Sequence, residues 1–195
     1  NKIESNAALL HIPITVFETD VFAVANNSEK NPCYLCARMR RGYLYSKAQE
    51  LGCNKIALGH HFNDVIETTV MSMFYGSQMQ AMLPKLHSTN FAGMELIRPL
   101  YCIHEEDILA WKQYNDLEFI QSACRFSQNC TMCDNRRGGY KRQAVKIPLR
   151  RLRCDNPNIE RSIFNSIQAA HQEMMPGCRT HTVLHSLTNG YLERG

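Results

Sequence analysis

Cysteine is the residue type whose spacing carries the most chemical information in this chain. Two pairs have the spacing Cys-x-x-Cys, Cys33 with Cys36 and Cys130 with Cys133, and Cys124 lies close to the second pair. Four thiolates in two such pairs suit a structural zinc ion, whereas three thiolates with one open iron suit a catalytic iron–sulfur cluster. Each pair alone also fits a redox dithiol or accidental spacing. The two pairs together favour a metal or cluster site.

A second candidate is the polar segment 59–64, Gly-His-His-Phe-Asn-Asp, which follows an apolar run. Glycine lets a ligand approach the backbone closely, and the carboxylate of Asp64 is a suitable ligand for Mg²⁺. The simpler interpretation is that Asn63 or Asp64 caps the helix that begins here, and from spacing alone we favour the cap. The adjacent His60 and His61 are less suited to share one metal ion.

Basic residues form the third group of candidates. Arg38, Arg40 and Arg41 lie early in an expected helix, where the helix dipole does not favour cations. This placement indicates an anionic partner such as phosphate or RNA, and the alternative is surface charge paired with acids elsewhere. The segment 136–153 carries many Lys and Arg residues and no acid. It is either a phosphate-contacting segment or a solvated helix face.

The elements around segment 59–64 must position these side chains. Apolar residues at helical spacing predict helices over 38–51 and 64–75, and the apolar run between them predicts a buried strand over 55–59. Helix, strand, polar loop and helix form half of a doubly wound α/β sheet. The loop then lies at the carboxyl end of a strand, where such sheets bind ligands.

The rest of the chain gives weaker patterns. Strands are expected over 12–18 and 96–100, with a further short one over 118–121, and helices over 105–115, 139–153 and 159–170. The Met-rich segment 79–86 is interpreted as irregular packing. We expect an α/β domain over 1–123, a Cys-rich loop with a basic helical extension over 124–173, and a loose tail over 174–195.

Composition sets limits on the protein class. The chain has 195 residues and a net charge of +4, which is too mild to indicate nucleic acid by itself. It holds no run of about 18 apolar residues and does not open with a charged-then-apolar leader. We therefore expect a cytoplasmic protein without a membrane partner, in which nine cysteines serve metal or redox chemistry rather than a disulfide framework.

Several motifs in this order resemble one known family. They are Pro32-Cys-x-x-Cys36-x-Arg38-x-Arg40-Arg41-Gly42, Lys55-Ile-Ala-Leu-Gly-His-His61 with Asp64, Met73-Phe-Tyr-Gly76, Pro84-Lys85-Leu86 and Ile97-Arg98-Pro99-Leu100. Over roughly residues 3–150 the chain resembles the tRNA 2-thiocytidine synthetases of the PP-loop ATP pyrophosphatase superfamily.

The resemblance implies a fold and a reaction. The fold would be a HUP-like doubly wound parallel sheet, here lacking its first strand and carrying a C-terminal helical extension. The family binds ATP with Mg²⁺, adenylates a base carbonyl of cytidine in the tRNA anticodon loop, and uses an oxygen-sensitive [4Fe–4S] cluster held by three cysteines to handle sulfur. Its expected partners are tRNA and a sulfur donor, either a cysteine desulfurase or sulfide, with a homodimer as a possible assembly.

The resemblance also assigns roles to residues. Cys33 and Cys36 match the first two cluster ligands of the family. Cys124 is the favoured third ligand because it follows the apolar pair 119–120, and Cys130 is its competitor. Gly59, His60, His61 and Asp64 match the signature beside the ATP site, and Arg38, Arg40 and Arg41 become candidates to contact nucleic acid.

Two positions depart from the family pattern. Asn63 stands where the family has an acid, which argues against a metal site made of two carboxylates. The phosphate-binding motif Ser-Gly-Gly-x-Asp-Ser does not occur in this sequence, so we expect that the chain alone does not use ATP. Two other functions follow: a non-catalytic metal- or cluster-binding module that binds RNA, or a PP-loop enzyme acting on a different small substrate.

Overall fold

The computed structural model describes residues 2–21, 32–119, 138–169, 177–180 and 183–186, and side chains within most of those ranges. The chain divides into two compact units, residues 1–151 and 152–195. The first unit holds a sheet, the helices around it and every described residue of the candidate site.

A three-stranded sheet lies at the base of the first unit. Its strands are β1 (Lys55–Ala57), β2 (Lys85–His87) and β3 (Glu95–Ile97), in the order β1-β3-β2. β1 and β3 are parallel, with Ile56 opposite Leu96, and β2 is antiparallel to β3. A parallel pair needs a crossover connection, and the helix between β1 and β3 supplies it. The predicted α/β class is therefore confirmed.

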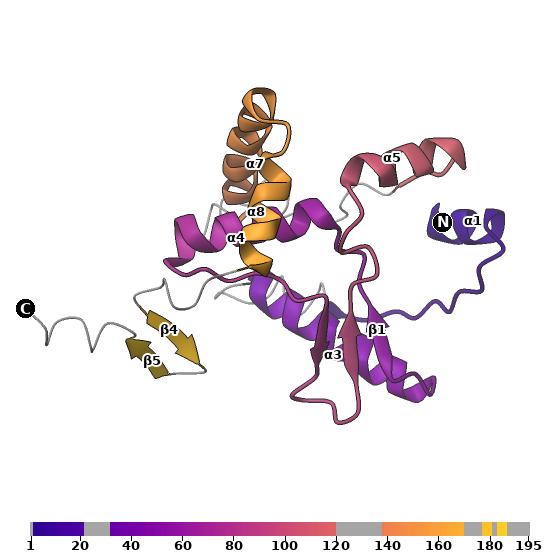
Figure 1. Cartoon of the computed structure of the whole chain (residues 1–195). Coiled ribbons are helices and arrows are strands. Elements are labelled where there is room, and N and C mark those ends of the chain that lie inside the picture. Colours follow the sequence, from indigo (N-terminus) through magenta and orange to yellow (C-terminus); the bar gives the residue numbers. More distant parts are fainter. Residues whose placement is uncertain (1, 22–31, 120–137, 170–176, 181–182, 187–195) are drawn as a thin grey trace, which may run out of the picture. The chain divides into compact units, whose positions relative to one another are not determined.

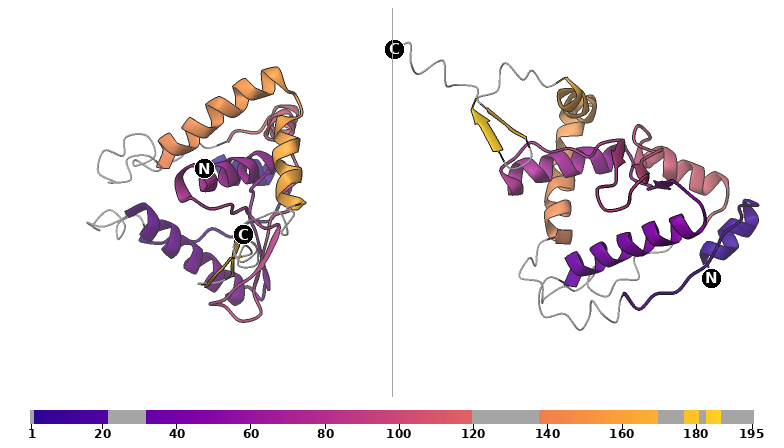
Figure 2. Two further views of the ribbon diagram at one scale, coloured as in Figure 1. Left: turned by 60° about the vertical axis from the view of Figure 1, so that its left-hand side comes forward. Right: turned by 90° about the horizontal axis from the view of Figure 1, so that it is seen from below.

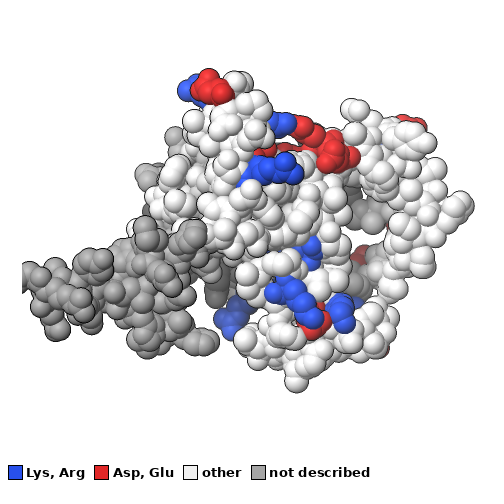
Figure 3. Space-filling model, in the orientation of Figure 1, with Lys and Arg blue, Asp and Glu red and all other residues white. Residues whose placement is uncertain are grey.

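β2 was not expected from the sequence, because segment 79–86 was interpreted as irregular packing. Its pairing with β3 is supported by charge: Glu95 on β3 lies 2.7 Å from the Lys85 ammonium group, 3.5 Å from Lys55 and 3.4 Å from Nδ1 of His87. Figure 3 shows basic side chains on both sides of an acidic one over this part of the face. The central acid on β3 therefore links basic side chains on both neighbouring strands, β1 and β2.

Two long helices belong to the same unit as this sheet. α3 (Pro32–Glu50) lies beside β1, and α4 (Phe62–Gly76) is the crossover helix (Figures 1 and 2). α4 buries Val65, Ile66 and Val70, as its helical periodicity predicts. It ends at Ser77, which has a left-handed backbone conformation (φ 52°).

The remaining elements are α1 (Lys2–Leu9), α5 (Glu105–Tyr114), α7 (Gly138–Asp155), α8 (Ile159–Gln168), and the antiparallel hairpin of β4 (Gly177–Thr180) and β5 (Val183–Ser186). The segment after 174, expected to be a loose tail, thus contains a hairpin. The two compact units meet within α7, after residue 151. The domain boundary expected at residue 123 stays a prediction.

The strand predicted over residues 12–18 is wrong. These residues form no strand, and their apolar side chains are exposed: Ile12 54%, Ile14 43% and Val16 60%. Alternating apolar residues produce a strand only when a neighbouring strand supplies the hydrogen bonds, and no described residue does so here. The possible strand over 118–121 is not formed at 118–119, and residues 120–121 lie outside the described ranges.

Within the described ranges, we find no helix with both the length and the apolar character needed to cross a membrane.

Candidate functional site

The first candidate residues lie at the start of α3. The helix begins at Pro32, and proline suits this position because no intrahelical N–H is needed there. Positions 33 and 36 are three apart, so they lie on the same side of the helix. Cys36 is partly exposed and has a free thiol. The side chain of Cys33 lies outside the described residues. The predicted ligand pair therefore shares the first turns of one helix.

The third cysteine ligand is not placed. Cys124, Cys130 and Cys133 all lie outside the described ranges, so the choice among them stays a prediction. Within the described residues, no three His, Cys, Asp or Glu side chains are grouped to hold a metal ion. The donor chemistry still fits a cluster, because two cysteines from one helix face plus one further thiolate leave one iron of a [4Fe–4S] cluster without a protein ligand.

The three arginines of α3 differ in where they lie. Arg38 and Arg41 line a cavity of about 700 Å³ between α3 and the β2–β3 hairpin, and Arg40 does not. All three are exposed. None forms an ion pair with a carboxylate in the part of the chain that the structure describes, so the alternative that they pair with acids finds no support there.

Segment 59–64 runs from the carboxyl end of β1 into α4. Asp64, in the first turn of α4, accepts a 3.1 Å hydrogen bond from the backbone N–H of His61, and His61 Nε2 lies 3.3 Å from the same carboxylate. The side-chain oxygen of Asn63 accepts a 2.9 Å hydrogen bond from the backbone N–H of Glu105, the first residue of α5. Asp64 therefore helps to cap α4, the helix that begins here, as the simpler interpretation predicted. Asn63 instead caps α5, which that interpretation did not predict.

Five charged side chains join α4, α5 and α7, and we call them the α4–α7 ion-pair network. Arg142 lies 2.8 Å from Asp64 and 3.6 Å from Glu67, and Lys146 lies 3.6 Å from Glu67 and 3.0 Å from Glu105. Asp64 and Glu67 are buried, with 9% and 4% exposure. The ion pairs of Asp64 and Glu67 with Arg142 and Lys146 join the first turns of α4 to α7. Arg142 and Lys146 are therefore engaged by acids rather than forming a solvated face.

Burial governs the ionisation of Glu67. Desolvation raises the pKa of its carboxyl group above 4.5, and the nearby Lys146 and Arg142 lower it only in part. Proton uptake by Glu67 is thus favoured relative to an exposed glutamate.

His60 is held by an arginine from the end of β3. Arg98 Nε donates to Nδ1 of His60 at 3.4 Å, and the Arg98 guanidinium also donates to the backbone carbonyl of Leu83. Burial lowers the pKa of His60 below 6.5; Asp64 opposes this shift and Arg98 adds to it. A neutral imidazole that accepts at Nδ1 carries its proton on Nε2. His60 is therefore held as a neutral Nε2–H donor.

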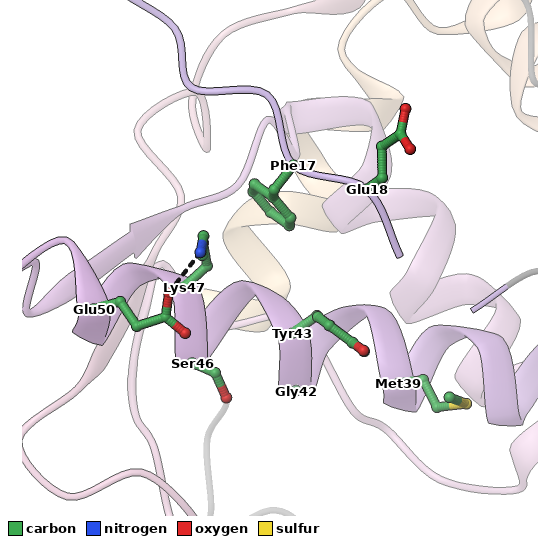
Figure 4. Close-up of a pocket in the computed structure, with 8 residues that line it drawn as sticks. All are labelled: Phe17, Glu18, Met39, Gly42, Tyr43, Ser46, Lys47 and Glu50. Atoms are coloured by element: carbon green, nitrogen blue, oxygen red, sulfur yellow. Dashed lines mark hydrogen bonds and ion pairs between the residues drawn. The ribbon is translucent and has the colours of Figure 1, made fainter. Parts of the chain in front are cut away.

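A second cavity, of about 330 Å³, lies between α3 and the residues just before Asp20. Figure 4 shows the Phe17 ring directed toward α3, which contributes Gly42, Tyr43 and Ser46 to the lining. Lys47 and Glu50 pair at its edge. None of the predicted site residues is among the residues that line this cavity.

Sequence reasoning missed three residues of this region: Glu67, Arg98 and Arg142 as a partner of Asp64. Glu67 had a signal, since it is an acid three positions after Asp64 on an otherwise apolar helix face. Arg98 belongs to the motif Ile97-Arg98-Pro99-Leu100, but the motif indicated no function for this side chain. Arg142 was one of many basic residues, and its partner is 78 positions away.

Comparisons with known proteins identify the family of this chain. A sequence profile described as a PP-loop domain matches residues 2–131. The chain is 36% identical over 162 residues to the tRNA-cytidine(32) 2-sulfurtransferase of Vibrio parahaemolyticus, covering 82% of this chain and 51% of that protein. It is 37% identical over 155 residues to the protein of the same name from Methylobacillus flagellatus, covering 78% and 48%. The chain thus spans about half the length of these curated relatives.

Among solved structures, the fold is similar to that of the U34-tRNA thiolase NcsA from Methanococcus maripaludis with its [4Fe–4S] cluster. The TM-score is 0.64 at 20% identity, and the match covers 100% of this chain and 66% of the thiolase. This similarity supports the fold, and the matched profile covers most of the chain. The chain belongs to the PP-loop domain family.

Proposed function

We propose that this protein takes part in ATP-dependent sulfur transfer to cytidine in tRNA. The observation that carries the proposal is the identity of more than a third, over four-fifths of the chain, with proteins named tRNA-cytidine(32) 2-sulfurtransferase. The fold similarity to a tRNA thiolase and the pair Cys33 and Cys36 at the start of α3 support the same reaction class.

The proposed chemistry has two steps. The carbonyl oxygen of the base attacks the α-phosphate of ATP, and pyrophosphate leaves. A sulfur nucleophile then attacks the activated carbon, and AMP leaves with the former carbonyl oxygen. Mg²⁺ would accompany the nucleotide phosphates. A [4Fe–4S] cluster held by Cys33, Cys36 and Cys124 would supply an iron atom open to sulfur.

Segment 59–64 is proposed to lie beside the nucleotide, with Gly59, His60, His61 and Asp64 as its contacts. Its place at the carboxyl end of a parallel strand supports this. The neutral Nε2–H of His60 suits hydrogen bonding to an anionic oxygen. Both oxygens of Asp64 already accept hydrogen bonds, one from His61 and one from Arg142. Asp64 is therefore better suited to hold the segment in place than to bind Mg²⁺ in this conformation.

Proposed partners and location follow from the reaction. Transfer RNA would be the substrate, and a cysteine desulfurase or sulfide the sulfur source. The cytoplasm is the expected place of action. Of the three arginines predicted to contact nucleic acid, Arg38 and Arg41 line a cavity and are the proposed contacts with the RNA, whereas Arg40 does not line it.

The first test is anaerobic reconstitution of the chain with iron and sulfide, measured by absorbance near about 400 nm and by metal analysis. We expect about four irons per chain, lost in Cys33→Ala, in Cys36→Ala and in one of Cys124→Ala or Cys130→Ala. Cys53→Ala is the matched control, because Cys53 is an exposed free thiol distant in sequence from both pairs. One tightly bound zinc and no iron would reject the cluster.

The second test asks for the product. The reconstituted chain is incubated with ATP, Mg²⁺, sulfide and tRNA that lacks thiolation, and the digested nucleosides are analysed by mass spectrometry. Because the phosphate-binding motif Ser-Gly-Gly-x-Asp-Ser does not occur in this sequence, the assay uses the chain fused to the segment of a curated relative that carries the motif. We then expect 2-thiocytidine that depends on ATP and on Cys36, and no product from the chain alone. A cluster-loaded fusion that binds tRNA but forms no thionucleoside would instead favour a non-catalytic RNA-binding module.

A further inference from the structure

The groove between α3 and the β2–β3 hairpin combines positive charge with polar side chains. It has a volume of about 700 Å³. One wall is α3, with Arg38, Arg41 and Gly42. The other wall is the hairpin, whose turn contributes hydroxyl, amide and imidazole groups; the lining residues from this wall include His87, Ser88, Thr89, Asn90 and Phe91.

The floor of the groove is ordered by specific contacts. Tyr45 of α3 stacks on Phe91 of the hairpin, with ring centroids 4.7 Å apart and planes 8° from parallel. Ser88 accepts a 3.1 Å hydrogen bond from the backbone N–H of Phe91, and its own backbone N–H donates to the carbonyl of Met94 at 2.9 Å. The stack and the closed turn hold the two walls at a fixed spacing, so the groove exists before any ligand binds.

Within the described ranges, no acidic side chain neutralises the positive charge of the groove. Arg38 and Arg41 are three positions apart, so both point to the same side of α3. No carboxylate lines the groove, and neither guanidinium forms an ion pair in the described part of the chain. The α7 cations differ, since Arg142 and Lys146 are engaged by acids. His87 and Tyr45 are the other titratable groups among the described residues that line the groove, and His87 lies near Glu95.

We propose that this groove binds the sugar–phosphate backbone of an RNA strand. Arg38 and Arg41 would contact phosphates from one wall, and Thr89 and Asn90 would hydrogen-bond the backbone from the other. An open groove with donors along two walls suits a strand rather than a single small anion. The inference rests on the proposed function, because it takes the RNA substrate from there, and it adds where that RNA lies.

The sequence supplies a matched control for this proposal. Arg40 has the same charge, exposure and helix as its two neighbours, but it does not line the groove. A general effect of positive charge would be equal for all three arginines. An effect specific to the groove would instead appear on substitution of Arg38 and Arg41 and not on substitution of Arg40.

The experiment measures binding of unfractionated tRNA to the 195-residue chain by fluorescence anisotropy at several salt concentrations. The variants are Arg38→Ala/Arg41→Ala, Arg38→Lys/Arg41→Lys and Arg40→Ala, each checked for folding by circular dichroism. We expect the double alanine variant to bind about tenfold more weakly and to reduce the salt-dependence slope by roughly two. The lysine variant should keep the slope, and Arg40→Ala should change affinity less than about twofold.

A direct readout complements the affinities. Benzoylphenylalanine at position 89, in the hairpin wall, should crosslink to tRNA on irradiation, and the crosslink should decrease in the double alanine variant. An unchanged slope in that variant, or an equal loss in Arg40→Ala, would overturn the groove while leaving sulfur transfer intact. Excess inorganic triphosphate that abolishes the crosslink without displacing tRNA would also overturn it, in favour of a free phosphate site. Groove-dependent tRNA binding without any thionucleoside product from the fused chain would reject the proposed function and retain the groove.

Discussion

Asp64, in the first turn of α4, accepts a 2.8 Å hydrogen bond from the guanidinium of Arg142 in α7. The same carboxylate caps α4 through the backbone N–H of His61. One buried acid therefore fixes both the conformation of segment 59–64 and the docking of a helix that follows much later in the sequence. The stability of the candidate site and the docking of α7 are coupled through this residue.

Arg142→Ala should destabilise the first unit. The substitution leaves Asp64 and Glu67 buried with fewer cations, and removing one partner of a buried pair is costly. Because the Arg142 side chain is 44% exposed, we expect a loss of only about 1 to 2 kcal/mol in the free energy of unfolding. Urea denaturation measures it, and Arg151→Ala, an exposed change nearby in the sequence, is the control. Equal midpoints for the two variants would contradict a role for the pair.

Glu67 should make stability fall as pH rises. Burial raises its pKa in the folded protein above 4.5, so the folded state binds the proton more tightly than the unfolded state does. Its destabilising effect is therefore absent well below pH 4.5 and fully present once pH exceeds the raised pKa. Relative to Glu67→Gln, the wild type should lose stability between those limits. Urea midpoints of both proteins from acidic to neutral pH measure the difference, and parallel curves would refute the prediction.

Arg98→Gln should raise the pKa of His60 toward 6.5. Burial is the main cause of the lowered pKa, and the charge of Arg98 contributes in the same direction. Removing that charge and the hydrogen bond to Nδ1 makes protonation easier. Titration of the His60 ring proton by NMR gives the value directly. His11, which is exposed and far from Arg98 in sequence, serves as the internal reference. A His60 titration that is the same in both proteins would argue against the contact.

Asn63→Ala should loosen the start of α5. Its side-chain oxygen accepts the backbone N–H of Glu105, and loss of such a cap costs about 1 kcal/mol. Asn63→Asp keeps an acceptor and should retain most of the stability. Amide hydrogen exchange at Glu105 distinguishes the two variants, since only the alanine variant should exchange faster there. Equal protection in both would show that the amide is satisfied in another way.

Local periodicity accounted for much of the fold. The apolar face of Val65, Ile66 and Val70 predicted α4, although the helix starts at Phe62 rather than at Asp64. The run at Lys55 predicted β1, but the prediction that this strand is buried is wrong, since Lys55 and Ala57 are exposed and Ile56 is half-buried. The cap interpretation of segment 59–64 is confirmed for Asp64. Each of these signals comes from residues within one or two helical turns of each other.

Longer-range features could not be read in the same way. The alternation of residues 12–18 predicted a strand, but a strand depends on a partner that periodicity does not report. β2 was not predicted because a strand of three residues is too short to show an alternating pattern of apolar and polar residues. The basic segment predicted either phosphate contacts or solvated charge, whereas Arg142 pairs with Asp64. Cys124, Cys130 and the tRNA contacts remain predictions from resemblance.

The 78-residue separation between Asp64 and Arg142 also sets the order in which the protein can fold. During synthesis, α4 leaves the ribosome well before α7 is synthesised. Asp64 and Glu67 are therefore exposed to water at that stage. The β2–β3 hairpin needs only local contacts and is able to form in that interval. Burial of Asp64 and Glu67 requires the cations of α7. It therefore occurs late, because the entropy cost of closing the long loop comes before the favourable energy of the ion pairs. Completion of segment 59–64 is therefore a late event in the folding of this chain.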